Sequence, residues 1–272
     1  MENIKGRESI VGIFDSGVGG LSVWKELIGI LPNNRFLYFS DNAYCPYGPR
    51  SRKEIISRAK SITDFFISNG VSLIVVACNT ATAAAIDTLR RCYDIPFIGM
   101  EPAIKPAALH SKSGVIGVLA TKGTFNGKLY HRTLERFASD INVIERTGTG
   151  LVEQVEAGEI NFPKTRELLK RYINPMIEGG ADHIVLGCTH YPFLLDEIRK
   201  IAGENVVIVN PAPAVAQHTY NTLIQYGLVS KDKLHPNRQT LFYSTGPIEN
   251  LVRIARSILP SIPQEQFIVN SI

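Results

Sequence analysis

Short apolar runs rich in β-branched and aromatic residues recur along this chain, and they constrain its fold more than any other feature. Nine such runs cover residues 9–15, 35–41, 72–78, 96–100, 114–120, 141–147, 183–188, 205–210 and 240–246. Most of the segments between them carry apolar residues at helical spacing, and the segment 51–70 ends at a glycine typical of a helix C-terminus. This alternation predicts an α/β protein with mostly parallel sheets flanked by helices.

The length of 272 residues exceeds the commonest size of a single domain, which favours two lobes. The runs are almost continuously apolar, so we expect both sheets to be interior. No Pro/Gly/Ser-rich linker is present, so we place the connections between the lobes near residues 96–106 and 207–214. The predicted first lobe contains residues 1–98 and 211–272, and the second contains residues 99–210.

Two of the runs end in the same way. "LIVVACNTATAAA" reaches Cys78 as the last residue of its predicted strand, and "HIVLGCTHYPFLL" reaches Cys188, 110 residues later. One motif falls in each predicted lobe, which suggests two pseudo-symmetric lobes that face each other. Because a parallel sheet binds ligands at the carboxyl edge of its strands, we expect the active site in the cleft between the lobes.

The residues after each cysteine favour a functional thiol over a buried apolar one. Asn79 and Thr80 are polar and begin a predicted helix, whose N-terminal amides would favour a thiolate at Cys78. Cys188 is followed by Thr189 and by His190, which could exchange a proton with the thiol. Zinc is the alternative explanation for a Cys/His pair, but it needs further ligands at a recognisable spacing, and we find none in the sequence. We therefore predict no metal site, and we interpret Cys45 and Cys92 as structural or incidental.

Two matched thiols that face each other indicate a reaction that inverts a carbon stereocentre by proton transfer. Inversion of a carbon stereocentre by proton transfer removes a proton from one face and delivers another to the opposite face. The ordinary thiol pKa of about 8.5 allows both the acid and the base form near neutrality.

The segment "FDSGVGGLS" places Asp15 and Ser16 at the end of the first predicted strand, before a glycine-rich turn. Such a turn into a helix is a natural seat for an anion. It is not a dinucleotide fingerprint, because Ser22 stands where the third glycine of GxGxxG would be, and no P-loop motif is present. We expect Asp15 to hold an ammonium group or to assist a thiol.

Further neutral donors follow other predicted strands. Tyr47 and Gly48 lie in the rigid loop "AYCPYGPRS", and Thr121 and Thr124 lie in "LATKGTF". A plain solvated turn explains each motif about as well, but together they suit a small carboxylate ligand.

Overall composition excludes several other classes of protein. The net charge is only +4, with no basic stripe and no nucleic-acid-binding motif. Four cysteines without a CxxC pair are too few for a disulfide scaffold. No signal-peptide core and no 18-residue apolar span is present, so we expect a soluble cytoplasmic protein that binds neither nucleic acid nor membrane.

The motifs "DSGVGGLS", "PYGPRS", "ACNTATAAA", "IGMEPA" and "LGCTHYPFL" occur in the order and spacing of the cofactor-independent glutamate racemases of the aspartate/glutamate racemase superfamily. The chain resembles this family over nearly its whole length. The resemblance implies two pseudo-symmetric α/β lobes, a glutamate buried between them, no cofactor and usually a homodimer. It also implies that D-glutamate is supplied for peptidoglycan synthesis in a bacterial cytoplasm.

The resemblance further implies roles for individual residues. Cys78 is similar to the thiol that serves the D-enantiomer and Cys188 to the one that serves the L-enantiomer, with Asp15 and His190 as their respective helpers. A glutamate near the second thiol corresponds to Glu156 or Glu153. The positions that match substrate-binding residues of the family are Asp15, Ser16, Tyr47, Gly48, Asn79, Thr80, Thr121, Thr124, Thr189 and His190.

Two positions depart from the family pattern, and three other functions stay open. Asn210 stands where many members have aspartate, and Phe125 replaces a smaller residue; we expect neither to touch the chemistry. A racemase of another amino acid such as aspartate would use the same scaffold. A noncatalytic two-lobe binding protein would not exchange the α-hydrogen, and a thiol hydrolase or transferase would form a covalent intermediate on one cysteine.

Overall fold

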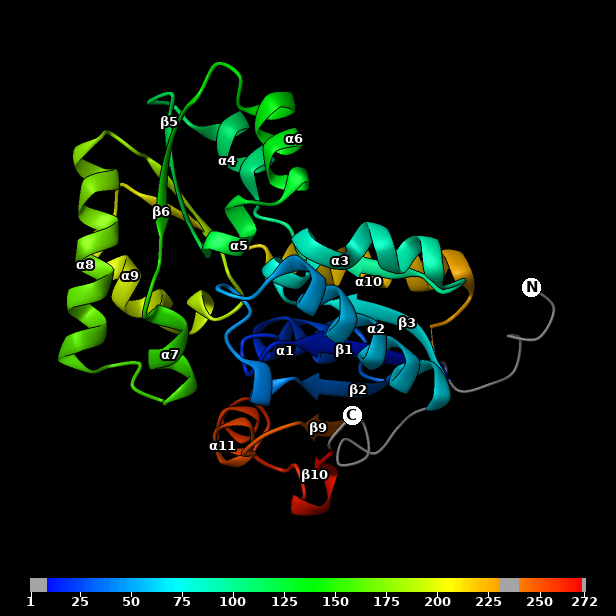
Figure 1. Ribbon diagram of the computed structural model, residues 1–272. Helices are drawn as coiled ribbons and strands as arrows, with labels where there is room; N and C mark the ends of the chain where they lie inside the picture. The colour runs from blue at the N-terminus through cyan, green and yellow to red at the C-terminus, as the bar shows by residue number, and fades with distance from the viewer. Residues whose placement is uncertain (1–8, 230–239, 271–272) are drawn as a thin grey trace.

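The computed structural model describes residues 9–229 and 240–270, which form two parallel sheets with helices around them (Figure 1). The first sheet has the order β10-β9-β2-β1-β3-β4 and the second the order β6-β5-β7-β8. The strands are β1 (Ile10–Asp15), β2 (Arg35–Ser40), β3 (Val71–Val76), β4 (Phe97–Gly99), β5 (Val115–Ala120), β6 (Asn142–Thr147), β7 (His183–Gly187), β8 (Val207–Val209), β9 (Thr240–Ser244) and β10 (Phe267–Val269).

Helices alternate with these strands along the chain, as the spacing of apolar residues predicts. The α-helices are α1 (Leu21–Ile30), α2 (Arg52–Ser68), α3 (Asn79–Cys92), α4 (Ile104–His110), α5 (Lys122–Phe125), α6 (Lys128–Phe137), α7 (Leu151–Glu156), α8 (Pro163–Glu178), α9 (Leu195–Ala202), α10 (Ala212–Tyr226) and α11 (Glu249–Ile258). Within residues 9–229 and 240–270 the chain also forms the short 3-10 helices η1 (Asn42–Tyr44), η2 (Tyr191–Leu194) and η4 (Gln264–Gln266). No helix in the described part of the chain is both long and apolar enough to cross a membrane.

Polar end groups fix several helix boundaries. The Ser51 hydroxyl accepts a hydrogen bond from the Glu54 amide at the start of α2. The chain leaves the same helix through Gly70, whose φ of +76° belongs to the left-handed region that favours glycine. Asn210 accepts a hydrogen bond from the Ala212 amide at the start of α10. This local contact needs only a side-chain oxygen, which an aspartate would supply as well.

The first sheet is covered on both faces, as expected. Alternate residues of β3 join different cores: Leu73 and Val75 pack with α1, α10 and α11, whereas Ile74 and Val76 pack with α2 and α3. Trp24 of α1 is fully buried, and its indole N–H donates to the Thr240 hydroxyl at 3.0 Å. These contacts hold the C-terminal strands of the chain against its N-terminal strands.

The second sheet is buried only in its centre. Helices α7, α8 and α9 cover one face and α4 and α6 the other (Figure 1). The edge strands β6 and β8, however, contain no buried residue. The expectation that both sheets are wholly interior is therefore wrong for these edges, where only one neighbouring strand is available.

Phe125 packs edge-to-face on Tyr130 in the core beside α6, with ring centroids 5.2 Å apart.

The chain passes from the first sheet to the second between β4 and α4, and it returns between β8 and α10. Helix α4 packs against β5 and β7, whereas α10 packs against α1. The carboxyl ends of β1 and β3 in the first sheet and of β5 and β7 in the second point into the region between the sheets (Figure 1). The motifs around Asp15, Cys78, Thr121 and Cys188 follow these strand ends, whereas the loop with Tyr47 and Gly48 follows β2 and η1.

Candidate active site

The two matched cysteines line a single cavity between the sheets. This cavity has a volume of about 10 Å³, and its lining consists of Ser16, Pro46, Tyr47, Gly48, Cys78, Asn79, Thr80, Thr121, Val152, Cys188, Thr189 and His190. Cys78 and Cys188 are each only 5% exposed. The structure therefore brings together thiols and neutral hydrogen-bonding groups from both sheets around one small space.

Cys78 lies two residues beyond the end of its strand, which corrects the prediction that it is the last strand residue. The β-ladder stops at Val76, and Cys78 is the N-cap of α3. Its sulfur accepts a hydrogen bond from the Ala81 amide at 3.4 Å and lies 3.9 Å from the Ser16 hydroxyl.

The environment of Cys78 favours the neutral thiol in this structure. Burial raises the pKa of Cys78, and the nearby charges of Asp15 and Cys188 raise it further. The Ala81 amide lowers this pKa but does not offset the burial. The expected preference for a thiolate at the helix N-terminus is therefore outweighed by desolvation.

Cys188 follows the last residue of β7 directly and lies beside a buried ion pair. Its sulfur is 3.7 Å from Nδ1 of His190, and Nε2 of His190 is 2.6 Å from Oε1 of Glu156. Burial, the largest single influence, lowers the pKa of His190, but hydrogen bonds to Cys188, Cys45 and Glu156 together raise it well above its usual value. Burial tends to raise the pKa of Glu156, and its contacts with His190 bring the net pKa below the usual value. Both shifts favour the charged form of the pair.

The structure places Glu156 and Glu153 differently. The Glu156 carboxylate contacts His190, as described above, whereas Glu153 lines a neighbouring cavity of about 220 Å³ together with Pro46, Gly48 and Thr121. Of the two carboxylates that the sequence leaves open, only Glu156 contacts the histidine beside Cys188.

The glycine-rich turn after β1 binds carboxylates of the protein itself. The Gly17 amide donates to Asp15 Oδ1 at 2.9 Å, and the Val18 amide donates to Glu156 Oε1 at 2.7 Å. A Cβ at Gly17 would lie 1.9 Å from Glu156 Oε1, and one at Gly19 would lie 2.4 Å from His190 Nδ1. The turn is therefore an anion seat, as predicted, and its glycines allow the second lobe to approach closely.

Asp15 lies behind the cavity and is fully buried. Its Oδ2 accepts a hydrogen bond from the Thr189 hydroxyl at 2.9 Å. Burial raises the pKa of Asp15. The nearby His190 and the hydrogen bonds that Asp15 accepts from Gly17 and Thr189 oppose this rise. This carboxylate thus connects the end of β1 with the residue that follows Cys188.

Three threonine hydroxyls form a chain across the lobes. Thr80 and Thr121 are 2.8 Å apart, and Thr121 and Thr124 are 3.0 Å apart. Thr80 and Thr121 line the cavity, but Thr124 does not. Thr124 lies behind Thr121 and also donates to the Gly187 carbonyl at 3.5 Å.

Tyr47 and Asn79 have different hydrogen-bonding states. The Tyr47 hydroxyl, which the sequence suggested as a donor to a carboxylate, instead donates to Asp41 Oδ2 at 2.5 Å. Asn79 donates to the Met100 carbonyl, but its Oδ1 is the only buried side-chain polar atom without a partner among the described residues. A buried acceptor that lacks a donor indicates a position where a ligand N–H group would be favourable.

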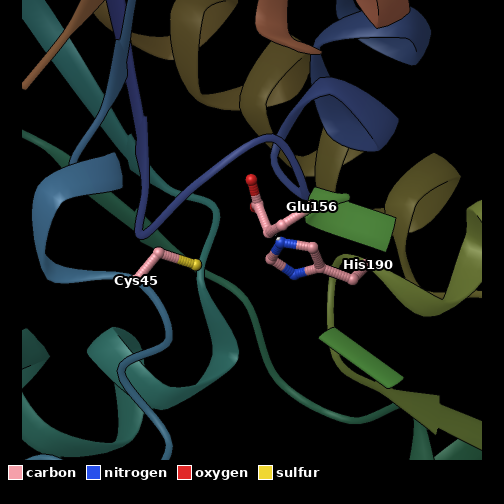
Figure 2. A group of neighbouring side chains, drawn as sticks. All are labelled: Cys45, Glu156 and His190. Carbon is pink, nitrogen blue, oxygen red and sulfur yellow. Dashed lines mark hydrogen bonds and ion pairs between the residues drawn. The ribbon is translucent and has the colours of Figure 1, made fainter. Parts of the chain in front are cut away.

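Sequence reasoning missed Cys45. It lies in the loop after η1, and its thiol, the Glu156 carboxylate and the His190 ring offer ligand atoms that all lie within 4.8 Å of one another (Figure 2). Burial raises the pKa of Cys45 to about 11. The only sequence signal was its position two residues before Tyr47 in a loop already assigned to the site. Cys92, by contrast, is exposed at the end of α3.

Comparisons with known proteins identify the family of this chain. The Asp/Glu/hydantoin racemase family model matches residues 25–219. A glutamate racemase of Herpetosiphon aurantiacus is 46% identical over 82% of this chain and 88% of its own length. The crystal structure of glutamate racemase isoform RacE1 from Bacillus anthracis covers 97% of both chains with a TM-score of 0.83 and 33% identity. The Escherichia coli glutamate racemase in complex with L-glutamate and the activator UDP-MurNAc-ala has a TM-score of 0.83 and 30% identity, and the match covers 97% of this chain and 98% of that chain.

These comparisons lead to one assignment. The family model matches most of the chain, the relatives are similar over most of its length, and the solved structures have the same architecture. The chain belongs to the Asp/Glu/hydantoin racemase family and, within it, to the glutamate racemases.

Proposed function

We propose that the cavity between the sheets is the active site at which L-glutamate and D-glutamate interconvert, without a cofactor, by proton transfer between two thiols. The observation that carries this proposal is that Cys78 and Cys188 line the same cavity from different sheets. An α-carbon held between the two sulfurs would have one acid/base group on each face.

In the L-to-D direction, Cys188 is the base and Cys78 the acid. The Cys188 thiolate takes the α-proton of L-glutamate, and the Cys78 thiol gives its proton to the opposite face of the carbanion. The enzyme then holds a thiol at Cys188 and a thiolate at Cys78, which is the form needed for the reverse reaction. The charged His190–Glu156 pair beside Cys188 and the raised pKa of Cys78 support this distribution of protons.

The remaining cavity residues would bind the substrate. The unpartnered Oδ1 of Asn79 is suited to accept a hydrogen bond from the α-ammonium group. The hydroxyls of Ser16, Thr80, Thr121 and Thr189 and the amide of Gly48 are neutral donors suited to the carboxylates. Donors to the α-carboxylate would also stabilise the charge that develops when the α-proton leaves, most strongly in a site without bulk water.

Turnover requires the two lobes, residues 1–98 with 211–272 and residues 99–210, to separate and close. A cavity of about 10 Å³ is close to the minimum that holds one water molecule, so glutamate cannot enter it as it stands. The E. coli relative whose structure contains L-glutamate has the same fold. We infer that substrate enters an open form and that closure removes water from the reacting carbon.

Two further features belong to this proposal. By its similarity to the family we expect the chain to act as a homodimer, which light scattering would test. We also expect its D-glutamate to supply peptidoglycan synthesis.

Incubation of L-glutamate with the protein in deuterium oxide tests the mechanism. We expect deuterium to appear first at the α-carbon of the D-product, because the thiol that protonates the carbanion exchanges with solvent. Cys78→Ser and Cys188→Ser should each lose racemisation by about 10²- to 10⁴-fold, whereas the exposed Cys92→Ser serves as the matched control. Full activity in either active-site variant would rule out the two-thiol mechanism, and inversion of aspartate at an equal rate would revise the substrate.

A further inference from the structure

Three potential metal ligands meet beside the two thiols assigned to catalysis. Cys45 comes from the loop that follows η1, Glu156 from the end of α7, and His190 from the turn after β7 (Figure 2). Their ligand atoms all lie within 4.8 Å of one another. Figure 2 shows the Cys45 sulfur directed toward the His190 ring.

We propose that Cys45, Glu156 and His190 form a binding site for a divalent cation of the zinc class, and that its occupation inhibits the enzyme. One sulfur, one imidazole nitrogen and one carboxylate oxygen are the donor types that zinc prefers. Three protein ligands leave a fourth position for water. A Cys45 thiolate and the Glu156 carboxylate would together neutralise the charge of the ion.

The neighbours of these residues already orient two of the ligands. The Val18 amide donates to Glu156 Oε1 at 2.7 Å and holds the carboxylate at the end of the glycine-rich turn. Nδ1 of His190 faces the Cys188 sulfur at 3.7 Å, so Nε2 points to Glu156 and away from Cys188. Such contacts behind the ligands fix ring orientation and favour binding at one defined nitrogen.

Binding would replace protons by the ion. Nε2 of His190 now shares a proton with Glu156 at 2.6 Å, and Cys45 carries a thiol proton. Both protons must leave before the atoms can bind a cation, so binding releases protons and strengthens as the pH rises.

Inhibition follows from the position of the site and rests on the function proposed above. The ion would remove the positive charge of His190 from its contact with Cys188. It would also connect the first lobe, through Cys45, to the second lobe, through Glu156 and His190. Because substrate entry requires the lobes to separate, an ion that joins them would oppose entry as well as proton transfer.

A titration of the full-length protein with Co²⁺ and with Zn²⁺ tests binding without reference to activity. We expect one ion per chain, with a cobalt–thiolate absorption band in the near ultraviolet. Cys45→Ala should lose that band and bind Zn²⁺ at least about tenfold more weakly, because one of the three ligands is absent. Cys92→Ala, which removes an exposed thiol outside the cluster, should bind as the wild type does.

Two outcomes would overturn the site. One is unchanged affinity in Cys45→Ala. The other is loss of binding in Cys78→Ser or Cys188→Ser with retention in Cys45→Ala, which would place the ion between the catalytic thiols.

Inhibition is measured separately, as the ratio of activity with and without Zn²⁺ in each variant. We expect a chelator to restore activity, and we expect Cys45→Ala to need at least about tenfold more Zn²⁺ for the same inhibition. Binding to Cys45 without inhibition would overturn the inhibitory role alone. Absence of racemisation with intact metal binding would overturn the proposed function and leave the site in place.

Discussion

A pair of oppositely charged side chains lies behind each half of the cavity, but only the pair in the second half contacts a thiol. In the first half, the Arg58 guanidinium binds both oxygens of Asp41 at 2.8 and 2.9 Å, and Asp41 also accepts the Tyr47 hydroxyl. In the second half, the His190–Glu156 pair lies directly against Cys188. The first pair therefore supports a wall of the cavity, whereas the second is placed to take part in chemistry.

The same contrast applies to the thiols. Cys78 is surrounded by a helix amide, the Ser16 hydroxyl and the nearby Asp15 carboxylate, and its pKa is raised. Cys188 has a charged imidazolium 3.7 Å away. Lobes with similar topology can thus present the same functional group in opposite electrostatic environments, which suits one acid and one base.

The largest expected effect comes from removal of the charge beside one thiol. His190→Asn should lower kcat for L-glutamate by about 10²- to 10⁴-fold, because Cys188 loses its charged partner. Removal of the α-proton from L-glutamate should then limit the rate, so the primary deuterium isotope effect should rise more with L-glutamate than with D-glutamate. Asp15→Asn should show the opposite bias, because the family resemblance assigns Asp15 to Cys78 and its charge acts on the pKa of that thiol. Equal changes in both directions for both variants would contradict the assignment of one helper to each thiol.

The supporting pair of the first half predicts a loss of stability. Arg58→Met leaves the Asp41 carboxylate buried without its cation, and we expect the free energy of unfolding to fall by about 3–5 kcal/mol in urea denaturation. Arg171→Met is the matched control, since it breaks an exposed pair with Glu167 and should cost less than about 1 kcal/mol. Similar losses in the two variants would mean that the buried pair has no special supporting role.

The pair of the second half predicts a change in pH dependence. The raised pKa of His190 means that its contribution to stability is complete below a pH of about 6.5 and is lost as the pH rises through the folded-state pKa. Glu156→Gln removes a hydrogen-bonded partner, so the His190 pKa should fall and the loss should occur at lower pH. Nitrogen NMR of the imidazole and urea denaturation at several pH values measure both effects. Glu153→Gln, one turn earlier in α7, should leave the His190 titration unchanged.

The smallest expected effect concerns the hydroxyl chain that joins the halves. Thr124→Val removes the hydrogen bond to Thr121 and a longer one of 3.5 Å to the Gly187 carbonyl without a large change in volume, which together cost about 1 kcal/mol. If closure depends on this chain, KM should rise about fivefold with little change in kcat. Steady-state kinetics would detect this, and an unchanged KM would limit the chain to a structural role. Thr133→Val is the control, because the Thr133 hydroxyl donates to the Leu129 carbonyl within α6.

Much of this architecture could be predicted from the sequence because its signals are local. The apolar runs identify nine of the ten strands in the described part of the chain, and the polar residues after Cys78 and Cys188 mark the edge where we propose that the substrate binds. The strand β10 was missed because three residues, Phe267–Val269, carry no periodicity. The exposure of β6 was missed because strand order within a sheet is a property of the whole chain.

Contacts between distant segments explain the other differences. No local pattern indicates that Cys45 would lie beside His190, or that Asp41 would take the Tyr47 hydroxyl. The sequence indicates the helix amide that lowers the pKa of Cys78. The burial that raises this pKa by more depends on residues from both lobes. The sequence therefore predicts which side chains reach the site more reliably than it predicts the protonation states of those side chains.

The small volume of the cavity has a consequence for inhibition. A space that holds at most about one water molecule admits neither substrate nor competitor as it stands, so either must bind while the two halves are apart. The chemistry depends on the two halves meeting, so a compound that holds them apart would stop turnover without resembling an amino acid. Compounds that bind between the separated halves are therefore an alternative to substrate mimics as inhibitors of this fold.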